Sequence, residues 1–262
     1  MKLEQYENEI ESDLAWRKVE IAHLFKIMSD AETKEVVMKS MVLLLYAHWE
    51  GFIKRTSKLY LKYVSEQKVK NKDLTVNFQA LMLKNFAKEC IEKDGMNLQK
   101  EFDFMNKQNK IENKPFKIKV DPNNEFDEDI INTQHNLSSK VLKNIAQIVG
   151  IRYNDVMKKR SKYIDSMLVN HRNAIGHAGK FASVKSKEDL LTFEKVEELK
   201  DFIVVMLNYY SEISADYAVK SFYLKENEKA REEYESEMEA KLEKEINKVS
   251  FDEKKIIEGL CD

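Results

Sequence analysis

The sequence predicts an all-α protein, and three features support this prediction. Only six glycines and two prolines interrupt 262 residues, which leaves long stretches of strong helix formers. Apolar residues recur at three- and four-residue steps through most of the chain, as on one face of a helix. Hydrophobic residues make up 43% of the sequence, enough for a substantial core. We therefore predict one helical domain over residues 1–224 with an irregular insertion at 96–130, followed by a charged helical tail over 225–262.

The first two helices are predicted over residues 3–30 and 32–66. The first carries apolar residues at helical spacing up to a polar break at Ser29 and Asp30. The second contains one of the longest apolar runs of the chain, Met41 to Ala47. This run is far shorter than the ~20 residues that cross a bilayer. We therefore expect a buried core segment and no membrane association.

A third helix is predicted over residues 73–93, and the pattern then becomes irregular. Residues 116–120 alternate between apolar and charged side chains, as in a short strand, which suggests a small hairpin at the edge of the bundle. The lysines of this insertion either contact phosphates or belong to a solvated loop. A fourth helix is predicted over residues 138–150, with Gly150 at its end.

The central helix is predicted over residues 159–178, with Gly179 as the left-handed residue that closes it. A further helix over residues 190–222 follows a loop, and its broad apolar face predicts burial. Beyond Leu224 the sequence is rich in Lys and Glu with few apolar residues. Such a segment is a solvated extension or a mobile tail, or alternatively a binding arm.

Three polar side chains lie on the last turns of the central helix. Asn173 and His177 are four residues apart and share a face, so the amide can orient the imidazole. Arg172 and His177 are roughly 140° apart around the helix and ~7.5 Å apart along it. They can still reach a common ligand, because Arg172 is long and Gly176 places no side chain between them. We therefore take Arg172, Asn173 and His177 as candidate catalytic residues.

Residues 172–177 form an Arg-x-x-x-x-His motif, and here the chain resembles the HEPN superfamily. The resemblance is to its bacterial branch with the RiboL-PSP and MAE-type families, and it extends over residues 5–220. Residues 43–54 resemble the second helix of that branch, and 136–142 with Val149-Gly150 resemble the segment before its motif. HEPN toxins paired with a nucleotidyltransferase antitoxin often have Tyr two residues after the motif His. This chain has Gly179 there, so regulation by modification is not expected.

The resemblance implies an endoribonuclease with a toxin-like or antiviral role, acting as a homodimer whose motif helices face each other. Partners would be RNA and an antitoxin or another component of a defence system. In this chemistry His177 takes the proton of a ribose 2′-hydroxyl, and Arg172 binds the phosphate. The product is a 2′,3′-cyclic phosphate, and neither a metal nor a cofactor is expected.

Two alternatives remain open at this point. An Arg and a His five residues apart can simply be a surface cation and a histidine that interacts with the dipole at the helix C-terminus. At the level of function, the alternative is a non-catalytic HEPN-type module that binds RNA or a protein.

Further residues are candidates for supporting roles. Glu50 is either exposed or directed at a partner such as Arg172, since a buried carboxylate needs a partner, and His48 and His171 are secondary candidates. Cys90 and Cys261 form no zinc or disulfide pattern, and the N-terminus lacks a secretory apolar core, so we expect a cytoplasmic protein. The net charge of −2 does not indicate a nucleic-acid binder, although a local basic surface remains possible. The candidate RNA-binding residues are Lys158, Lys159, Arg160 and Lys180.

Overall fold

The computed structural model describes residues 1–28, 34–91, 98–176 and 191–249. Across these ranges the chain forms helices and no strand, which confirms the all-α class; β-pairing is limited to two isolated bridges. The helices are α1 (Leu3–Met28), α2 (Lys34–Glu66), α3 (Val76–Ile91), α4 (Gln99–Glu112), α5 (Ser139–Val149), α6 (Asp155–Lys159), α7 (Ser161–Tyr163), the π-helix η2 (Ile164–Asn170), α8 (His171–Gly176), α9 (Phe193–Val219) and α10 (Glu228–Ile246), with 3-10 turns η1 (Asn71–Asp73) and η5 (Lys225–Asn227).

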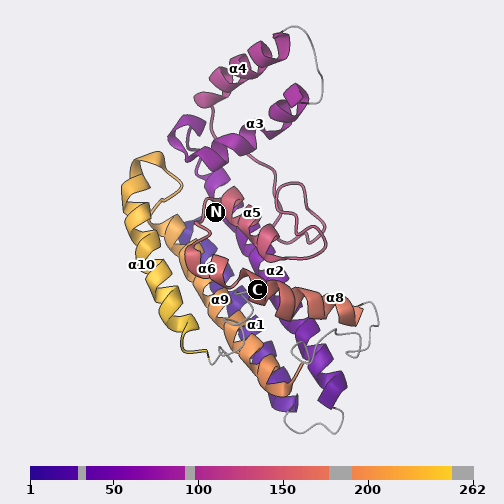
Figure 1. Ribbon diagram of the computed structural model, residues 1–262. Helices are drawn as coiled ribbons and strands as arrows, with labels where there is room; N and C mark the ends of the chain where they lie inside the picture. Colours follow the sequence, from indigo (N-terminus) through magenta and orange to yellow (C-terminus); the bar gives the residue numbers. More distant parts are fainter. Residues whose placement is uncertain (29–33, 92–97, 177–190, 250–262) are drawn as a thin grey trace, which may run out of the picture.

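The long helices α1, α2 and α9 pack side by side and form the core (Figure 1). Trp49 and Phe52 of α2 and Phe202 of α9 are completely buried there. Burial of each such side chain stabilises the fold by roughly 1.5–3 kcal/mol. The buried hydroxyl of Tyr6 donates to the Ser214 carbonyl at 3.0 Å and so ties α1 to α9. The apolar spacing in the sequence therefore predicts these three helices correctly.

By length and composition, the Glu35–Glu66 part of α2 is the one described helix that qualifies to cross a membrane. Core helices of soluble proteins meet the same criteria, and 44% of its most apolar 18-residue stretch is buried inside the bundle. The helix thus has a buried side and an open apolar side.

The Arg17 side chain of α1 packs closely on α2 at Gly51. An added Cβ at this position would lie 3.0 Å from Nη1 of Arg17. The absence of a side chain lets the Arg17 guanidinium lie flat against α2, where Asp13 accepts from its Nε at 3.2 Å. Both charged side chains are buried, and burial of a charge is tolerated when it is paired and hydrogen-bonded.

The prediction of an irregular segment over residues 96–130 is confirmed for residues 113–130, which form turns and extended backbone, and is wrong for residues 99–112 and for the suggested hairpin. Helix α4 occupies part of it and lies against α3, and the two helices extend from one end of the bundle (Figure 1). Residues 116–120 are extended, with an inward and outward alternation of burial, but they form no strand. Phe116 is completely buried and packs edge-on against Phe78 with ring centres 5.3 Å apart. The alternating pattern thus reports contact with the core and not pairing in a sheet.

The ends of α5 agree with the prediction. The Ser138 side chain caps its first turn by accepting from the Val141 N–H. Gly150 ends it with φ of 82°, a left-handed conformation that glycine adopts without strain. An added Cβ there would also meet the side-chain amide of Asn77 at 2.9 Å, so the position excludes larger residues.

The central helix agrees with the prediction over residues 159–178 as far as the structure describes it, because α7, η2 and α8 form one uninterrupted helix over residues 161–176. Its middle part, η2, is a π-helix, which was not predicted. A separate short helix, α6, precedes it: Asn154 caps α6 by accepting from the Met157 N–H at 2.9 Å, and a turn at Arg160 ends it. The part of the prediction beyond Gly176 lies outside the described residues. Helix α9 begins after Thr192, whose hydroxyl accepts from the Lys195 N–H.

Helix α10 corrects the expectation of a solvated extension. It packs against α9 and α6, and one face of it is buried. Its apolar residues recur every four residues, and this regular spacing brings all of them to the bundle in spite of the charged composition around them. The buried apolar residues are Tyr234, Met238, Leu242 and Ile246.

Candidate functional site

Arg172 lies on α8, at the surface of α2. Its guanidinium carbon is 4.8 Å from the centre of the Tyr46 ring, and its Nη1 donates to Asn173 Oδ1 at 3.0 Å. A cation over an aromatic ring contributes roughly 0.5–2 kcal/mol, depending on its exposure. The ring and the amide therefore hold the guanidinium in a defined position.

Tyr46 connects Arg172 to two other parts of the chain. Its side chain is buried, and its hydroxyl accepts from the Leu137 N–H at 2.7 Å. The same hydroxyl lies within hydrogen-bonding reach of the Glu50 carboxylate, one turn further along α2. Burial and the neighbouring Glu50 raise the pKa of Tyr46 well above its usual range. The phenol therefore stays protonated at neutral pH and can donate to Glu50.

Leu137 is held by α2 through both of its backbone groups. Its carbonyl accepts from Trp49 Nε1 at 3.2 Å, and its N–H donates to Tyr46. Two residues later, Ser139 donates from its N–H and its hydroxyl to Asp165 of η2, at 2.8 and 2.6 Å. The three sequence segments that carry the HEPN resemblance, 43–54, 136–142 and the motif helix, thus meet at one place.

The π-helix η2 immediately precedes the motif. π-Helices are rare and are often found at functional sites. His171, at the end of η2, is buried, and its Nδ1 donates to the Ser166 carbonyl at 2.9 Å when that nitrogen carries the proton. The candidate His171 therefore stabilises the wide turn that sets the direction of α8, on which Arg172 and Asn173 lie.

The other candidate residues are placed in different ways. Glu50 lies on the face of α2 that Arg172 contacts, since both side chains contact Tyr46. His177 and Lys180 lie outside the described residues, so the predicted contact between Asn173 and His177 remains a prediction. Gly176, the last described residue of α8, is exposed, and no described atom comes within 4 Å of a Cβ added to it.

His48 lies on the other side of α2, toward α1. It is buried, its Nε2 is 3.3 Å from Glu20 Oε2, and its ring meets the Trp16 ring edge-on at 5.5 Å. Burial, and next the Arg17 guanidinium, lower the pKa of His48. The structure therefore does not bring His48 together with Arg172.

The candidate RNA-binding residues of α6 are also separate from Arg172. Lys158 pairs with Asp155 at 2.7 Å, and Lys159 lies 3.5 Å from Glu243 of α10. The twelve residue-to-residue steps from Arg160 to Arg172 correspond to roughly 18 Å at 1.5 Å per residue. The candidate RNA-binding residues of α6 thus lie beside α10, at a distance from the motif.

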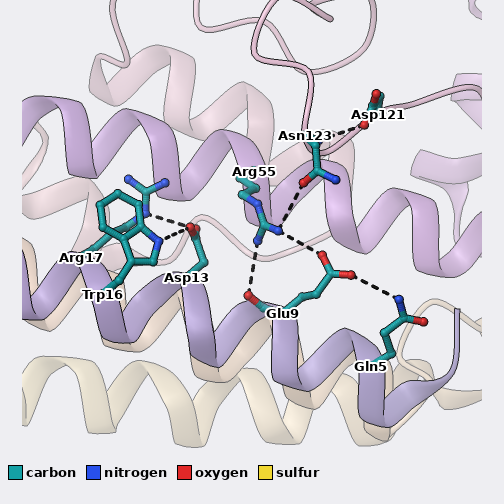
Figure 2. Close-up of polar contacts among 8 residues, drawn as sticks. All are labelled: Gln5, Glu9, Asp13, Trp16, Arg17, Arg55, Asp121 and Asn123. Atoms are coloured by element: carbon teal, nitrogen blue, oxygen red, sulfur yellow. Dashed lines mark hydrogen bonds and ion pairs between the residues drawn. The ribbon is translucent and has the colours of Figure 1, made fainter.

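A shallow groove of about 720 Å³ runs along α1, and Arg172 is not among its lining residues. Two of its three carboxylates, Glu9 and Asp13, are paired within the protein, as Figure 2 shows. Asp13 accepts from Trp16 at 2.9 Å and from Arg17 at 3.2 Å, and Glu9 accepts from Arg55 at 3.0 Å. We interpret these contacts as a structural network that joins α1 and α2. The groove is lined by Lys2, Glu4, Gln5, Asn8, Glu9, Ser12, Asp13, Trp16 and Arg55.

Two roles in this site were not anticipated from the sequence. Tyr46 was expected to be a core residue only, and Asp165 was not a candidate. A signal for Tyr46 is present in the sequence, because it lies four residues before Glu50 and therefore on the same helical face. In the part of the chain that the structure describes, no group of three or more His, Cys, Asp or Glu side chains is arranged to hold a metal ion.

Of the comparisons with known proteins, one found a match. No curated protein and no solved structure matches the chain. A family model described as MAE_28990-like HEPN matches residues 6–213, which include most of α1, all of α2, the segment before α5, the motif and most of α9. This match covers well over half of the sequence, and the chain therefore belongs to the MAE_28990-like HEPN family.

Proposed function

We propose that this protein is a metal-independent endoribonuclease. The observation that carries the proposal is the placement of Arg172, whose guanidinium rests on the Tyr46 ring four residues before the exposed Gly176. Of the five N–H groups of a guanidinium, one donates to Asn173. The others can bind the oxygens of a phosphate in the bidentate geometry that arginine favours.

The proposed reaction uses the ribose as the nucleophile. His177 takes the proton of the 2′-hydroxyl, and the O2′ atom attacks the adjacent phosphorus. The bond between phosphorus and O5′ breaks, and the leaving oxygen takes up a proton. Arg172 stabilises the negative charge that develops on the phosphate oxygens, an effect that typically contributes ~10² to ~10³ in rate. The products are a 2′,3′-cyclic phosphate and a 5′-hydroxyl.

We further propose a homodimer in which the two motif helices face each other. The open side of α2 supports this arrangement, because Leu43 and Val36 are 38% and 62% exposed there. Leu43 lies three residues before Tyr46, so this apolar surface borders the Arg172 site. A two-fold axis at this surface would join two copies of Arg172 and His177 in one cleft. Light scattering of the purified protein at micromolar concentration is expected to give the mass of two chains, and the mass of one chain would contradict the dimer.

In the cell we place this activity in the cytoplasm, as a toxin-like or antiviral function controlled by an antitoxin or another defence component. The test of the activity is incubation of the purified protein with total RNA in the presence of a chelator. Cleavage that yields cyclic-phosphate ends supports the proposal. A folded protein that binds RNA and leaves it intact supports instead the non-catalytic HEPN module.

A further inference from the structure

The charges of this chain are distributed unevenly along the sequence. Residues 130–187 contain eleven Lys or Arg and only two Asp or Glu, Asp155 and Asp165, whereas the whole chain has a net charge of −2. The rest of the chain is therefore strongly acidic. A global charge near zero conceals a segment with a large positive excess, and this segment includes α5 and the helix that carries Arg172.

The two acidic residues of this segment are both paired. Asp165 accepts two hydrogen bonds from Ser139, and Asp155 pairs with Lys158 at 2.7 Å. Acidic residues of α10 reach other cations of the segment, since Arg152 lies 3.4 Å from Glu239 and Lys159 lies 3.5 Å from Glu243. The cations beside α6 are thus partly neutralised by neighbouring carboxylates.

The lysines of α5 are in a different situation. Lys140 and Lys143 are exposed, and neither forms an ion pair with a residue in the described ranges. Helix α5 itself contains no acidic residue. At about 100° per residue, Lys140, Lys143, Asn144 and Gln147 fall within an arc of roughly 100°, so they share one exposed face. This face presents two positive charges and two amides that can donate and accept hydrogen bonds.

The exposed face of α5 begins beside the Arg172 site. Lys140 directly follows Ser139, which is bound to Asp165 of η2. Leu137, three residues before Lys140, is bound to the hydroxyl of Tyr46, whose ring supports Arg172. Both α5 and α8 pack on α2, and Figure 1 shows them along its length. A polyanion bound at Arg172 can therefore continue along α5.

We propose that the exposed face of α5, defined by Lys140, Lys143, Asn144 and Gln147, binds the strand of single-stranded RNA that flanks the phosphate at Arg172. This inference rests on the proposed function for the choice of RNA as the polyanion. The lysines contact phosphates and set affinity, and such contacts carry little sequence information. The cations of α6 contribute less, because acidic neighbours already face them.

The experiment compares two double variants with the same change in charge, Lys140→Gln with Lys143→Gln, and Lys158→Gln with Lys159→Gln. Binding is measured by fluorescence anisotropy at several salt concentrations, with the full chain and a 2′-O-methyl RNA that lacks the nucleophile. Each phosphate contact on a single strand contributes a slope of about −0.7 to the plot of log affinity against log salt. The α5 variant is therefore expected to lose about 1.4 in slope and at least tenfold in affinity at low salt, and the α6 variant much less.

Equal losses in the two variants would overturn the assignment to α5, as would unchanged binding in the α5 variant. The assignment would also be overturned if the parent protein failed to bind this RNA at every salt concentration tested. It would likewise be overturned if these lysines bound anionic phospholipid vesicles and the protein did not bind RNA. Circular dichroism and light scattering verify that both variants keep the fold and assembly of the parent. Because the RNA used is not cleavable, a parent that binds it through α5 but never cleaves natural RNA disproves the nuclease and leaves the α5 surface in place.

Discussion

The Arg172 guanidinium lies 4.8 Å from the centre of the Tyr46 ring, and the Tyr46 hydroxyl binds the Leu137 N–H at 2.7 Å. One side chain of α2 thus supports the motif arginine with its ring and the segment before α5 with its hydroxyl. The two functions of Tyr46 can be separated by substitution, because phenylalanine keeps the ring and leucine removes it.

We predict that Tyr46→Phe retains most of the activity and Tyr46→Leu loses about tenfold or more in kcat/KM. Loss of the ring contact costs up to roughly 2 kcal/mol, and 1.4 kcal/mol corresponds to a factor of ten. Both variants leave the buried Leu137 N–H without its acceptor, at roughly 1–3 kcal/mol of stability. Urea unfolding measures that shared loss and initial rates of RNA cleavage measure the difference. Equal activity losses in the two variants would show that the ring does not position Arg172.

A second prediction concerns Gly176. An added Cβ meets no described atom within 4 Å, so Gly176→Ala is expected to fold normally and to gain up to about 0.5–1 kcal/mol from the better helix propensity of alanine. If the helix continues to His177, as the sequence predicts, the methyl group would lie between the side chains of Arg172 and His177, and there it would hinder a phosphate that both residues contact. We therefore expect slower cleavage with unchanged or higher thermal stability. Undiminished cleavage by a folded Gly176→Ala protein would argue against a phosphate in that space.

The contact between α9 and α10 predicts a specific pH dependence. Burial raises the pKa of Glu235, whose carboxylate accepts from the Tyr217 hydroxyl. The folded state therefore binds a proton more tightly than the unfolded state, in which Glu titrates near 4.3. This contribution to stability is complete below about pH 4 and is lost as the pH rises through the raised pKa. We expect urea unfolding to show that the parent loses stability relative to Glu235→Gln as the pH rises from about 4 through the raised pKa of Glu235.

Glu245→Gln provides the matched control for that experiment. Glu245 is on the same helix, but a hydrogen bond from Lys248 lowers its pKa. Its contribution has the opposite sign, because it is present above the unfolded pKa and is lost as the pH falls. If Glu235→Gln and Glu245→Gln shift the pH profile in the same direction, the assignment of a buried, raised carboxyl at Glu235 is wrong.

The spacing of apolar residues in the sequence predicts those helices that bury a long apolar face. Helices α1, α2 and α9 have long buried faces, and their bounds agree with the predictions to within a few residues. Helix α4 lacks this signal, since only Ile111 of its residues is buried. Helix α10 has a narrow apolar stripe that is obscured by its charges until the neighbouring helices are known.

The candidate site also has parts that could be predicted from the sequence and parts that could not. The motif could be recognised from the sequence, whereas its place at a helix end stays a prediction, because His177 and Gly179 lie outside the described residues. The role of Tyr46 was missed, because its four-residue spacing from Glu50 is a weak signal and its sequence pattern is otherwise that of any core aromatic. The π-helix was also beyond prediction, since the wide turn at Ser166 depends on a local hydrogen bond from His171 that no repeat pattern encodes.

Cleavage of one defined RNA oligonucleotide in excess chelator, by the parent and by Arg172→Ala, Asn173→Ala and His177→Ala, tests the central proposal most directly. Loss of a general base commonly costs ~10² to ~10⁴ in rate, and loss of a charge-stabilising donor ~10² to ~10³. We predict that the parent leaves 2′,3′-cyclic phosphate ends, that the Arg172 and His177 variants are inactive with unchanged helicity, and that Asn173→Ala is milder. Cleavage by His177→Ala at the rate of the parent, or loss of parent activity in chelator, would contradict the proposed mechanism.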